Sequence, residues 1–154
     1  MLPAASLSER IMEDYTCRIK RERPKLIKGF ANPVHLVADY IVQNNIDIGF
    51  ECNIITTGEP LYVHQREAIE KAFGGRVFDS YGAREVSLIG QECERHRGYH
   101  VNMECAFVEF VNDEDINVSN GEPGNILITD LVNRGMPFIR YKINDKGIFK
   151  PENC

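Results

Sequence analysis

The chain has 154 residues, of which 43% are hydrophobic and 27% charged, and its formal net charge is −5. This is the size and composition of an ordinary soluble globular domain with a core of its own. The negative charge argues against a nucleic-acid-binding domain, which is usually basic, and no apolar run is long enough to span a membrane.

The five cysteines are an odd number, and they accompany four histidines. The chain starts without the basic leader and apolar core of a secretory signal. These features favour metal ligands or free thiols over a disulfide framework. We therefore expect a cytoplasmic protein.

Residues 6–92 alternate between helix and strand patterns, which is typical of an α/β layer. Ser6 followed by Glu9 forms a capping box that is expected to begin the first helix. Asn32 and Pro33 are expected to begin the second helix, as its cap and its first residue. The expected elements are, in order, helix 6–23, strand 26–30, a helix from 32 to the "QNN" at 43–45, strand 52–57, helix 60–73 and strand 75–78.

The stretch from Asp79 to Glu85, "DSYGARE", follows the last of these strands and is expected to be a glycine turn. Ligands of open α/β sheets bind outside the carboxyl ends of the strands, where a glycine lets the backbone come close. Tyr81 offers a flat apolar face there, and Glu85 offers a carboxylate. The alternative is a buried core tyrosine beside a solvated ion pair of Arg84 and Glu85.

The earlier turn "TTGEP", residues 56–60, has Gly58, Glu59 and Pro60 at its end. Threonine hydroxyls and free backbone N–H groups at a helix start can cradle a phosphate or a sugar. The motif is weak alone, and a simple helix-entry turn is the alternative.

Four residues of zinc-ligand type fall within thirteen positions: Cys93, His96, His100 and Cys105. Cys93 and His96 can share one turn, and the other two lie at the ends of a strand-like run. Four such ligands would form a closed, structural zinc site that ties the loop 93–105 to a sheet. The spacing differs from that of a standard zinc finger, and Cys105 is alternatively a small buried strand residue.

Residues 106–154 are rich in strand patterns. The alternation predicts strands at 100–111, 125–131 and 138–141, with a polar hairpin loop over 112–125 and a turn, "KINDKG", over 142–147. Helical units first and strands afterwards predict an α/β fold in which a parallel layer is followed by an antiparallel, strand-rich section.

The order of these turns resembles the adenylate-forming enzymes. The features that carry the resemblance are "TTGEP", then "DSYGARE", then the strand "GEPGNILITDL", then "MPFIRYKINDKG". The similarity is to the phenylacetate–CoA ligase-like branch, which includes capsule-biosynthesis relatives. It extends over roughly residues 25–154.

The resemblance implies that a carboxylic acid attacks the α-phosphate of ATP to give an acyl-adenylate, and that the thiol of CoA then takes the acyl group. It implies that Tyr81 stacks on adenine, that Gly82 allows close backbone approach, and that Glu85 is the catalytic carboxylate that holds Mg2+. Asp145 would accept hydrogen bonds from both ribose hydroxyls. Residues 58–60 match a turn beside the nucleotide. The Cys and His cluster is similar to one found in part of this branch, which favours zinc.

Two residues depart from the family pattern. Arg84 replaces the usual threonine, and because a guanidinium can itself bind a phosphate, Arg84 is kept among the nucleotide-binding candidates. Asn144 precedes Asp145 where a glycine is usual, and asparagine tolerates the same backbone conformation.

Family members are far longer, with a phosphate loop upstream and a carboxy-terminal domain that carries the catalytic lysine. Residues 1–154 are therefore expected to be a fragment of the AMP-binding domain, inactive alone because the lysine that neutralises charge in the transition state is missing. Two alternatives are a zinc-stabilised domain that binds a nucleotide or a partner without chemistry, and a ligase-fold protein of capsular polysaccharide biosynthesis. The partners expected for the parent enzyme are a carboxylic acid, ATP and CoA, with no nucleic acid and no membrane. A homodimer is left open.

Overall fold

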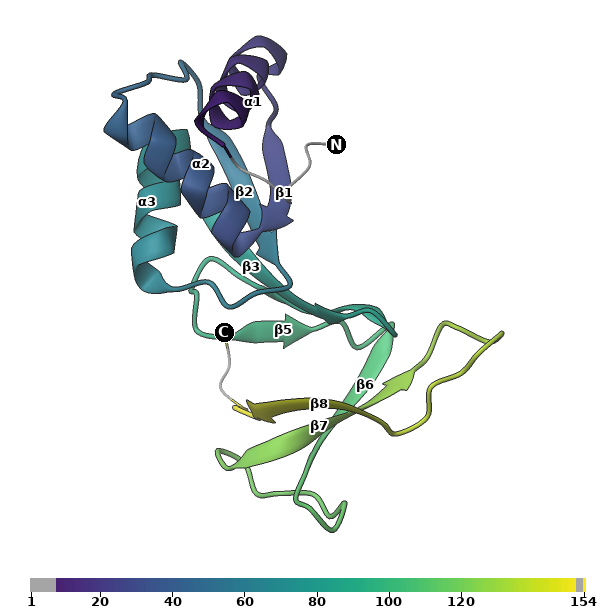
Figure 1. Ribbon diagram of the computed structural model, residues 1–154. Helices are drawn as coiled ribbons and strands as arrows, with labels where there is room; N and C mark the ends of the chain where they lie inside the picture. The colour runs from purple at the N-terminus through teal and green to yellow at the C-terminus, as the bar shows by residue number, and fades with distance from the viewer. Residues whose placement is uncertain (1–7, 152–153) are drawn as a thin grey trace. The chain divides into compact units, whose positions relative to one another are not determined.

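A computed structural model describes residues 8–151 and residue 154 (Figure 1). The elements are, in chain order, α1 (Glu9–Glu22), β1 (Leu26–Phe30), α2 (Ala31–Gln43), β2 (Cys52–Thr57), α3 (Val63–Phe73), β3 (Gly74–Ala83), β4 (Ser87–Glu92), β5 (Tyr99–Val101), β6 (Ala106–Val111), β7 (Pro123–Asp130) and β8 (Tyr141–Ile148). The chain divides into two compact units, Met1–Ser80 and Tyr81–Cys154. Among the described residues, no helix has both the length and the apolar character that crossing a membrane requires.

The strands form two sheets. One has the order β1-β2-β3-β4-β5, and the other has the order β6-β7-β8. The first three strands are parallel, whereas the β4–β5 pair and the whole second sheet are antiparallel. The α/β fold with a strand-rich second part, predicted from the sequence, is confirmed.

The first unit packs its three helices with β1, β2 and the start of β3. Phe30 of β1 is opposite Thr57 of β2, and Thr57 is opposite Ser80 of β3, so the carboxyl ends of the parallel strands meet at one edge. One cluster of buried side chains joins the helices to the strands. Its largest fully buried members are Ile41, Ile54, Ile69, Phe73 and Val77.

The first two helices begin at other residues than expected. Ser6 lies outside the described residues, and α1 begins at Glu9 with Ser8 as its N-cap, so the capping box expected at Ser6 is not the start of the helix. Because α2 begins at Ala31, Asn32 lies inside its first turn rather than at the cap.

The third helix begins later than predicted because its capping residues are Tyr62 and Gln65. The side-chain oxygen of Gln65 accepts a hydrogen bond from the Tyr62 N–H over 3.0 Å, and the two residues form a capping box. Gly74 ends this helix with a φ of 68°, as its position in the sequence predicts.

The strand β3 is longer than predicted, because it continues through most of the residues expected to form the glycine turn. The Thr56 hydroxyl of β2 donates to Oδ1 of Asp79 over 2.7 Å, and the Ser80 hydroxyl donates to the Thr56 carbonyl over 2.9 Å. All three side chains are buried, so breaking these bonds would leave polar groups unsatisfied. The turn therefore comes later, at residues 84–86.

The second unit has a small core of its own, made by Ile89, Ala106, Ile126 and Ile128. The single strand predicted over 100–111 is two strands, because the N–H groups of Cys105 and Ala106 both donate to the Asn102 carbonyl, each over 3.0 Å, and form a turn. The predicted hairpin between β6 and β7 is confirmed by their antiparallel pairing.

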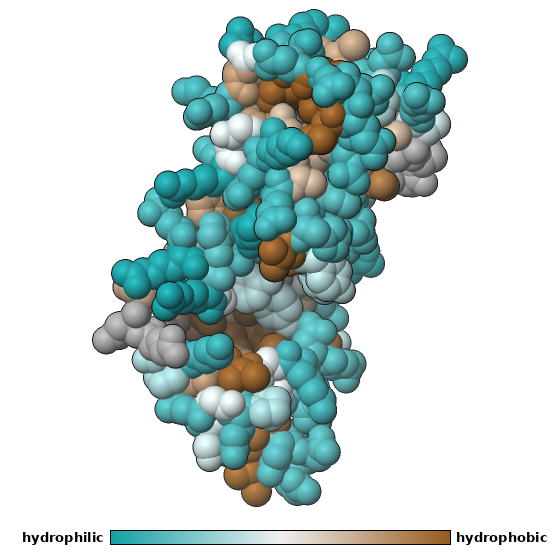
Figure 2. All heavy atoms as spheres, turned by 90° about the vertical axis from the view of Figure 1, so that its left-hand side faces the viewer, coloured by the Kyte–Doolittle hydropathy of each residue, from teal (hydrophilic) through white to brown (hydrophobic). Residues whose placement is uncertain are grey.

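One face of the protein is mainly polar. Figure 2 shows that hydrophilic side chains, in teal, cover most of one face and that apolar side chains, in brown, appear there in smaller groups. Among the described residues the most exposed large apolar side chains are Val63, Met103 and Ile139. Exposed apolar residues of this kind are common on folded proteins.

Candidate functional site

Two of the predicted nucleotide-binding side chains contact each other. The hydroxyl of Tyr81, in β3, donates a hydrogen bond to Oδ2 of Asp145, in β8, over 2.7 Å. The ring of Tyr81 also lies near that of Tyr99, with 5.8 Å between the ring centroids. Burial of the phenol, together with the hydrogen bond to Asp145, raises the pKa of Tyr81 above its usual value. An aromatic face and a carboxylate thus meet within the second unit.

Asp145 lies in a bulge of β8, in a segment that was expected to be a turn. Between two matched pairs of the ladder, β7 has one residue, Ile126, and β8 has three, 143–145. Asn144 has a φ of 63°, a left-handed conformation that asparagine adopts more readily than most residues. The predicted strand at 138–141 is wrong, since β8 begins only at Tyr141. The bulge takes Asp145 out of the regular ladder, as bulges near binding sites do.

Gly82 is required by the packing of the strands themselves. A Cβ atom at this position would lie 2.3 Å from the backbone oxygen of Ser87 in β4. Glycine is therefore the residue that lets β3 and β4 approach each other at this point. Its role beside a bound nucleotide stays a prediction from the family resemblance.

Arg84 and Glu85 lie exposed in the turn after β3. The hydroxyl of Tyr141, the first residue of β8, donates to Oε1 of Glu85 over 3.3 Å. Within the part of the chain that the structure describes, the guanidinium of Arg84 has no hydrogen-bond or ion-pair partner. The Arg84–Glu85 ion pair considered as an alternative therefore does not form.

A cavity of about 350 Å³ lies beside this turn in the second unit, and Arg84, Glu85, Cys105 and Asp130 are among the residues that line it. The Asp130 carboxylate accepts hydrogen bonds from two backbone N–H groups, those of Val132 at 2.8 Å and Asn133 at 3.0 Å. These N–H groups lower the pKa of Asp130. The carboxylate of Asp130 thus stabilises the loop that follows it, whereas the guanidinium of Arg84 is available to a ligand.

Gly58, Glu59 and Pro60 lie in the first unit, just beyond the carboxyl end of β2. Gly58 has a φ of 74°, and a Cβ there would lie 2.7 Å from the Phe30 ring, so only glycine fits. One carboxylate oxygen of Glu59 accepts a hydrogen bond from the Asn32 N–H over 2.9 Å. This N–H belongs to the first turn of α2, where backbone donors lack partners within the helix. Glu59 therefore stabilises the start of α2, whatever else it binds.

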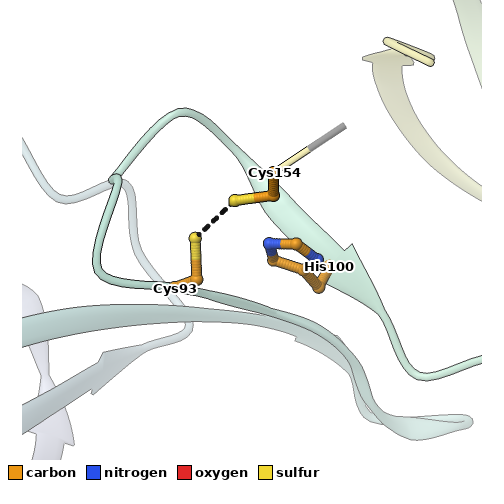
Figure 3. A group of neighbouring side chains, drawn as sticks. All are labelled: Cys93, His100 and Cys154. Atoms are coloured by element: carbon orange, nitrogen blue, oxygen red, sulfur yellow. Dashed lines mark hydrogen bonds between the residues drawn. The ribbon is translucent and has the colours of Figure 1, made fainter. Parts of the chain in front are cut away.

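The thiols of Cys93 and Cys154 and the imidazole of His100 form a group in the second unit (Figure 3). The two sulfur atoms lie 3.1 Å apart, and all three ligand atoms lie within 4.8 Å of one another. The Arg95 N–H, together with Cys154 and His100, lowers the pKa of Cys93 to about 7. The hydrogen bond with Cys93 raises the pKa of Cys154.

His96 and Cys105, two of the four predicted zinc ligands, do not belong to this group. Nδ1 of His96 lies 3.1 Å from Oε2 of Glu92 and forms an ion pair with it when the imidazole is protonated. Cys105 lines the cavity beside Arg84 instead. Cys154 was absent from the predicted set, because it lies far in the sequence from the candidate ligands in residues 93–105.

The donor set of this group fits zinc better than the harder cations. Two thiolates and one imidazole are ligands that Zn2+ prefers, whereas Mg2+ and Ca2+ prefer oxygen. Zn2+ binds sulfur at about 2.3 Å and nitrogen at about 2.0–2.1 Å, so ligand atoms within a few ångströms of one another can share one ion. Among the described residues the group offers three ligands, which leaves one coordination position for a further group.

Comparison with solved structures shows which fold the chain has. The chain has the fold of part of an adenylate-forming acid–CoA ligase, which confirms the resemblance noted in the sequence. A crystal structure of 2-hydroxyisobutyryl-CoA ligase in complex with 2-HIB-AMP and CoA matches 97% of this chain, with a TM-score of 0.82 and 18% sequence identity.

Two curated proteins are similar in sequence. Protein CapK of Staphylococcus aureus is 25% identical over 146 residues, which is 94% of this chain. Phenylacetate-coenzyme A ligase of Escherichia coli strain K12 is 34% identical over 91 residues, or 56% of this chain. The chain spans only 31% and 21% of these two proteins, and 37% of the solved ligase chain. No protein-family model matches it.

Proposed function

We propose that this chain is the nucleotide-binding part of an AMP-forming acid–CoA ligase. Tyr81 stacks on adenine, Asp145 binds the ribose hydroxyls and Glu85 holds Mg2+ on the phosphates. The observation that carries the proposal is the hydrogen bond between Tyr81 and Asp145, two residues 64 positions apart in the chain. A flat ring beside a carboxylate suits a nucleoside, because the base stacks on the ring and the ribose diol donates to the carboxylate.

The turn after β3 supplies the charges that a nucleotide phosphate needs. Arg84 offers a guanidinium that no described residue pairs with, and a guanidinium binds phosphate through two parallel hydrogen bonds. Glu85 offers a carboxylate, the type of ligand that Mg2+ takes from proteins. Both residues line the cavity of about 350 Å³, which has room for part of a ligand. The nucleotide roles of Gly58, Glu59, Pro60 and Gly82 rest on the motif resemblance alone.

In the complete enzyme the reaction proposed has two steps. The carboxylate of the acid attacks the α-phosphate of ATP, which forms the acyl-adenylate and releases pyrophosphate. The sulfur of CoA then attacks the acyl carbon, which forms the thioester and releases AMP. A solved ligase that shares the fold holds an acyl-AMP and CoA, which supports these ligands for the parent protein. Capsular polysaccharide biosynthesis, which the family resemblance implies, is the second candidate context, and the similarity to Protein CapK extends over 94% of the chain.

We also propose that Cys93, His100 and Cys154 hold a structural zinc ion, in place of the four residues expected from spacing. The support is their mutual distance and the lowered pKa of Cys93, which makes the thiolate available near neutral pH. The ion would join the loop after β4, the strand β5 and the end of the chain. It would thus cross-link three segments of a unit whose apolar core is small.

Calorimetric titration of the chain with AMP, with Asp145→Ala as the matched variant and the zinc content measured on the same samples, tests both proposals. We expect AMP to bind and the variant to lose most of the affinity. A folded, zinc-loaded protein that binds no AMP would contradict the nucleotide role of this chain and favour the alternative of a zinc-stabilised domain without nucleotide chemistry. Affinity that is unchanged in the variant would contradict the role of Asp145.

A further inference from the structure

Two tyrosine hydroxyls hold the two carboxylates to which ligand-binding roles are assigned above. Tyr81 donates to Asp145 over 2.7 Å, and Tyr141 donates to Glu85 over 3.3 Å. We propose that both hydroxyls are positioning groups, which fix the ribose-binding and magnesium-binding carboxylates before the nucleotide arrives. The inference rests on the proposed function and adds to it a role for Tyr141 and a second role for Tyr81.

The two hydrogen bonds join the same two segments, and in each bond the tyrosine of one segment donates to the carboxylate of the other. Tyr81 and Glu85 come from the end of β3 and the turn after it, and Tyr141 and Asp145 come from β8. Each segment contributes one tyrosine and one carboxylate, four positions apart. The pairs therefore connect the two segments at two points, and each hydrogen bond limits the displacement of one segment relative to the other.

Both carboxylates need such support because of where they lie. Asp145 is exposed in the bulge of β8, and Glu85 is exposed in a turn. An exposed side chain without a fixed partner samples several rotamers, and ordering it on binding costs conformational entropy. A hydrogen bond from a fixed donor selects one orientation in advance, which reduces that cost.

The donors themselves are fixed by aromatic neighbours. The ring of Tyr81 is partly buried and lies 5.8 Å from Tyr99, and the ring of Tyr141 meets Phe138 edge-on at 4.8 Å between centroids. These distances are typical of aromatic pairs. Each ring therefore has an aromatic neighbour that restricts its rotamers, although Tyr141 is 37% exposed. The restricted hydroxyl then orients the carboxylate that it contacts.

The hydroxyl of Tyr81 does not block the ribose. A carboxylate has two oxygens with about four lone-pair positions in all, and the tyrosine uses one of them on Oδ2. Oδ1 and the remaining position on Oδ2 can still accept hydrogen bonds from both hydroxyls of the diol. The tyrosine thus orients Asp145 and leaves its binding capacity in place.

The substitution Tyr81→Phe tests the first pair, because it keeps the ring that would stack on adenine and removes only the hydroxyl. We expect AMP to bind about tenfold more weakly, the lower range for the loss of a group that orients a ligand-binding residue. Binding of 2′,3′-dideoxy-AMP, which lacks the diol, should be unchanged. Tyr40→Phe, which removes a hydroxyl from α2 in the first unit, is the control. Tighter AMP binding by Tyr81→Phe, or equal losses for both nucleotides, would overturn the positioning role.

The substitution Tyr141→Phe tests the second pair with Mn2+ as a paramagnetic probe in the presence of ATP. We expect the apparent affinity for the ion to fall about tenfold while the affinity for AMP without metal is kept. The hydrogen bond from Tyr141 is longer than the one from Tyr81. We therefore expect the loss in ion affinity to be no larger than the loss in AMP affinity caused by Tyr81→Phe. Metal affinity equal to that of the unchanged chain would overturn the role of Tyr141.

If the unchanged chain binds no nucleotide, that result contradicts only the proposed function. A double-mutant cycle measured by thermal unfolding then still tests the inference. Tyr81→Phe, Asp145→Asn and the double variant are compared with the unchanged chain. A hydrogen bond that orders Asp145 predicts that the two losses in Tm do not add. Strictly additive losses would mean that the side chains are independent in solution and would overturn the inference.

Discussion

The sulfur atoms of Cys93 and Cys154 lie 3.1 Å apart, although the two residues are separated by 61 positions in the chain. His100 completes the group, so residues from the loop after β4, from β5 and from the end of the chain converge on one point (Figure 3). A bound ion would add a cross-link to a unit with a small apolar core, and the stability of that unit would then depend on metal.

Removal of zinc should therefore lower the Tm of the zinc-loaded chain, and Cys93→Ser and Cys154→Ser should cause similar losses. His96→Ala and Cys105→Ser are the matched controls, since neither residue belongs to the group of three. Thermal unfolding followed by circular dichroism, with and without a chelator, measures the effect. Identical melting in both conditions would contradict a structural zinc site. Losses for Cys93→Ser, His96→Ala and Cys105→Ser, with none for Cys154→Ser, would favour the ligand set expected from spacing.

In the metal-free protein, Cys93 should react with iodoacetamide at a rate that rises through about pH 7, because only the thiolate is nucleophilic and its pKa is lowered to about 7. Cys154→Ser removes one of the groups that lower this pKa, so the rise should move to higher pH. Mass spectrometry of the peptide that carries Cys93 measures the rate. A rise that begins only near the ordinary cysteine pKa of about 8.5 would contradict the hydrogen bonding described for this thiol.

Stability should fall at alkaline pH partly because of Tyr81. Its pKa is raised in the folded state, so the folded protein keeps the phenol proton to a higher pH than the unfolded chain, whose tyrosines titrate near about pH 10. The stabilisation is therefore complete below about pH 10 and is lost as the pH rises above it. Urea unfolding at rising pH should show a shallower decline for Tyr81→Phe than for the unchanged chain. Parallel declines would mean that Tyr81 ionises as an exposed phenol does.

The substitution Gly82→Ala should destabilise the protein, because its Cβ would lie 2.3 Å from the Ser87 backbone oxygen and the two strands would have to separate. Overpacking of this kind typically costs about 1–3 kcal/mol. Gly135→Ala is the matched control, since the nearest atom to its Cβ is 3.7 Å away. Denaturant unfolding measures both variants. Equal stability of the two would show that β3 and β4 can move apart without cost.

At Asn144, glycine should be tolerated and valine should not. The φ of 63° is open to glycine and asparagine, whereas a β-branched residue there is strained by roughly 1–2 kcal/mol. Asn144→Val should therefore lower the free energy of unfolding and weaken AMP binding through the neighbouring Asp145, and Asn144→Gly should preserve both. A valine variant that matches the glycine variant would contradict a fixed bulge.

Much of the fold was predictable because its signals are local. The glycine at 74 that ends α3, the β-branched strand at 52–57 and the polar loop of the β6–β7 hairpin were all identified from sequence patterns and confirmed. Helix starts were less predictable, since Asn32 has the chemistry of a cap but lies inside α2, where its N–H is satisfied by Glu59.

The differences between the expected and the observed site come from contacts between segments that are distant in the sequence. Asp79 and Ser80 looked like turn residues, but hydrogen bonds to Thr56 keep them in β3. The segment at 142–147 also looked like a turn and is instead a bulged strand paired with β7. Spacing favoured Cys105 as a metal ligand, and no local pattern could place Cys154 beside Cys93.

The bulge of β8 carries the residue assigned to ribose, while the residues on either side of it pair with β7. Protein engineering can therefore change the bulge without changing these pairs. Three residues of β8 face one residue of β7, so deletion of two residues, Asn144 and Asp145, would restore a one-to-one ladder. Deletion of two residues leaves every later side chain of β8 on its original face of the sheet, whereas deletion of one residue would move each of them to the opposite face. The shortened chain would keep the ladder between β7 and β8 and would lack the carboxylate assigned to ribose.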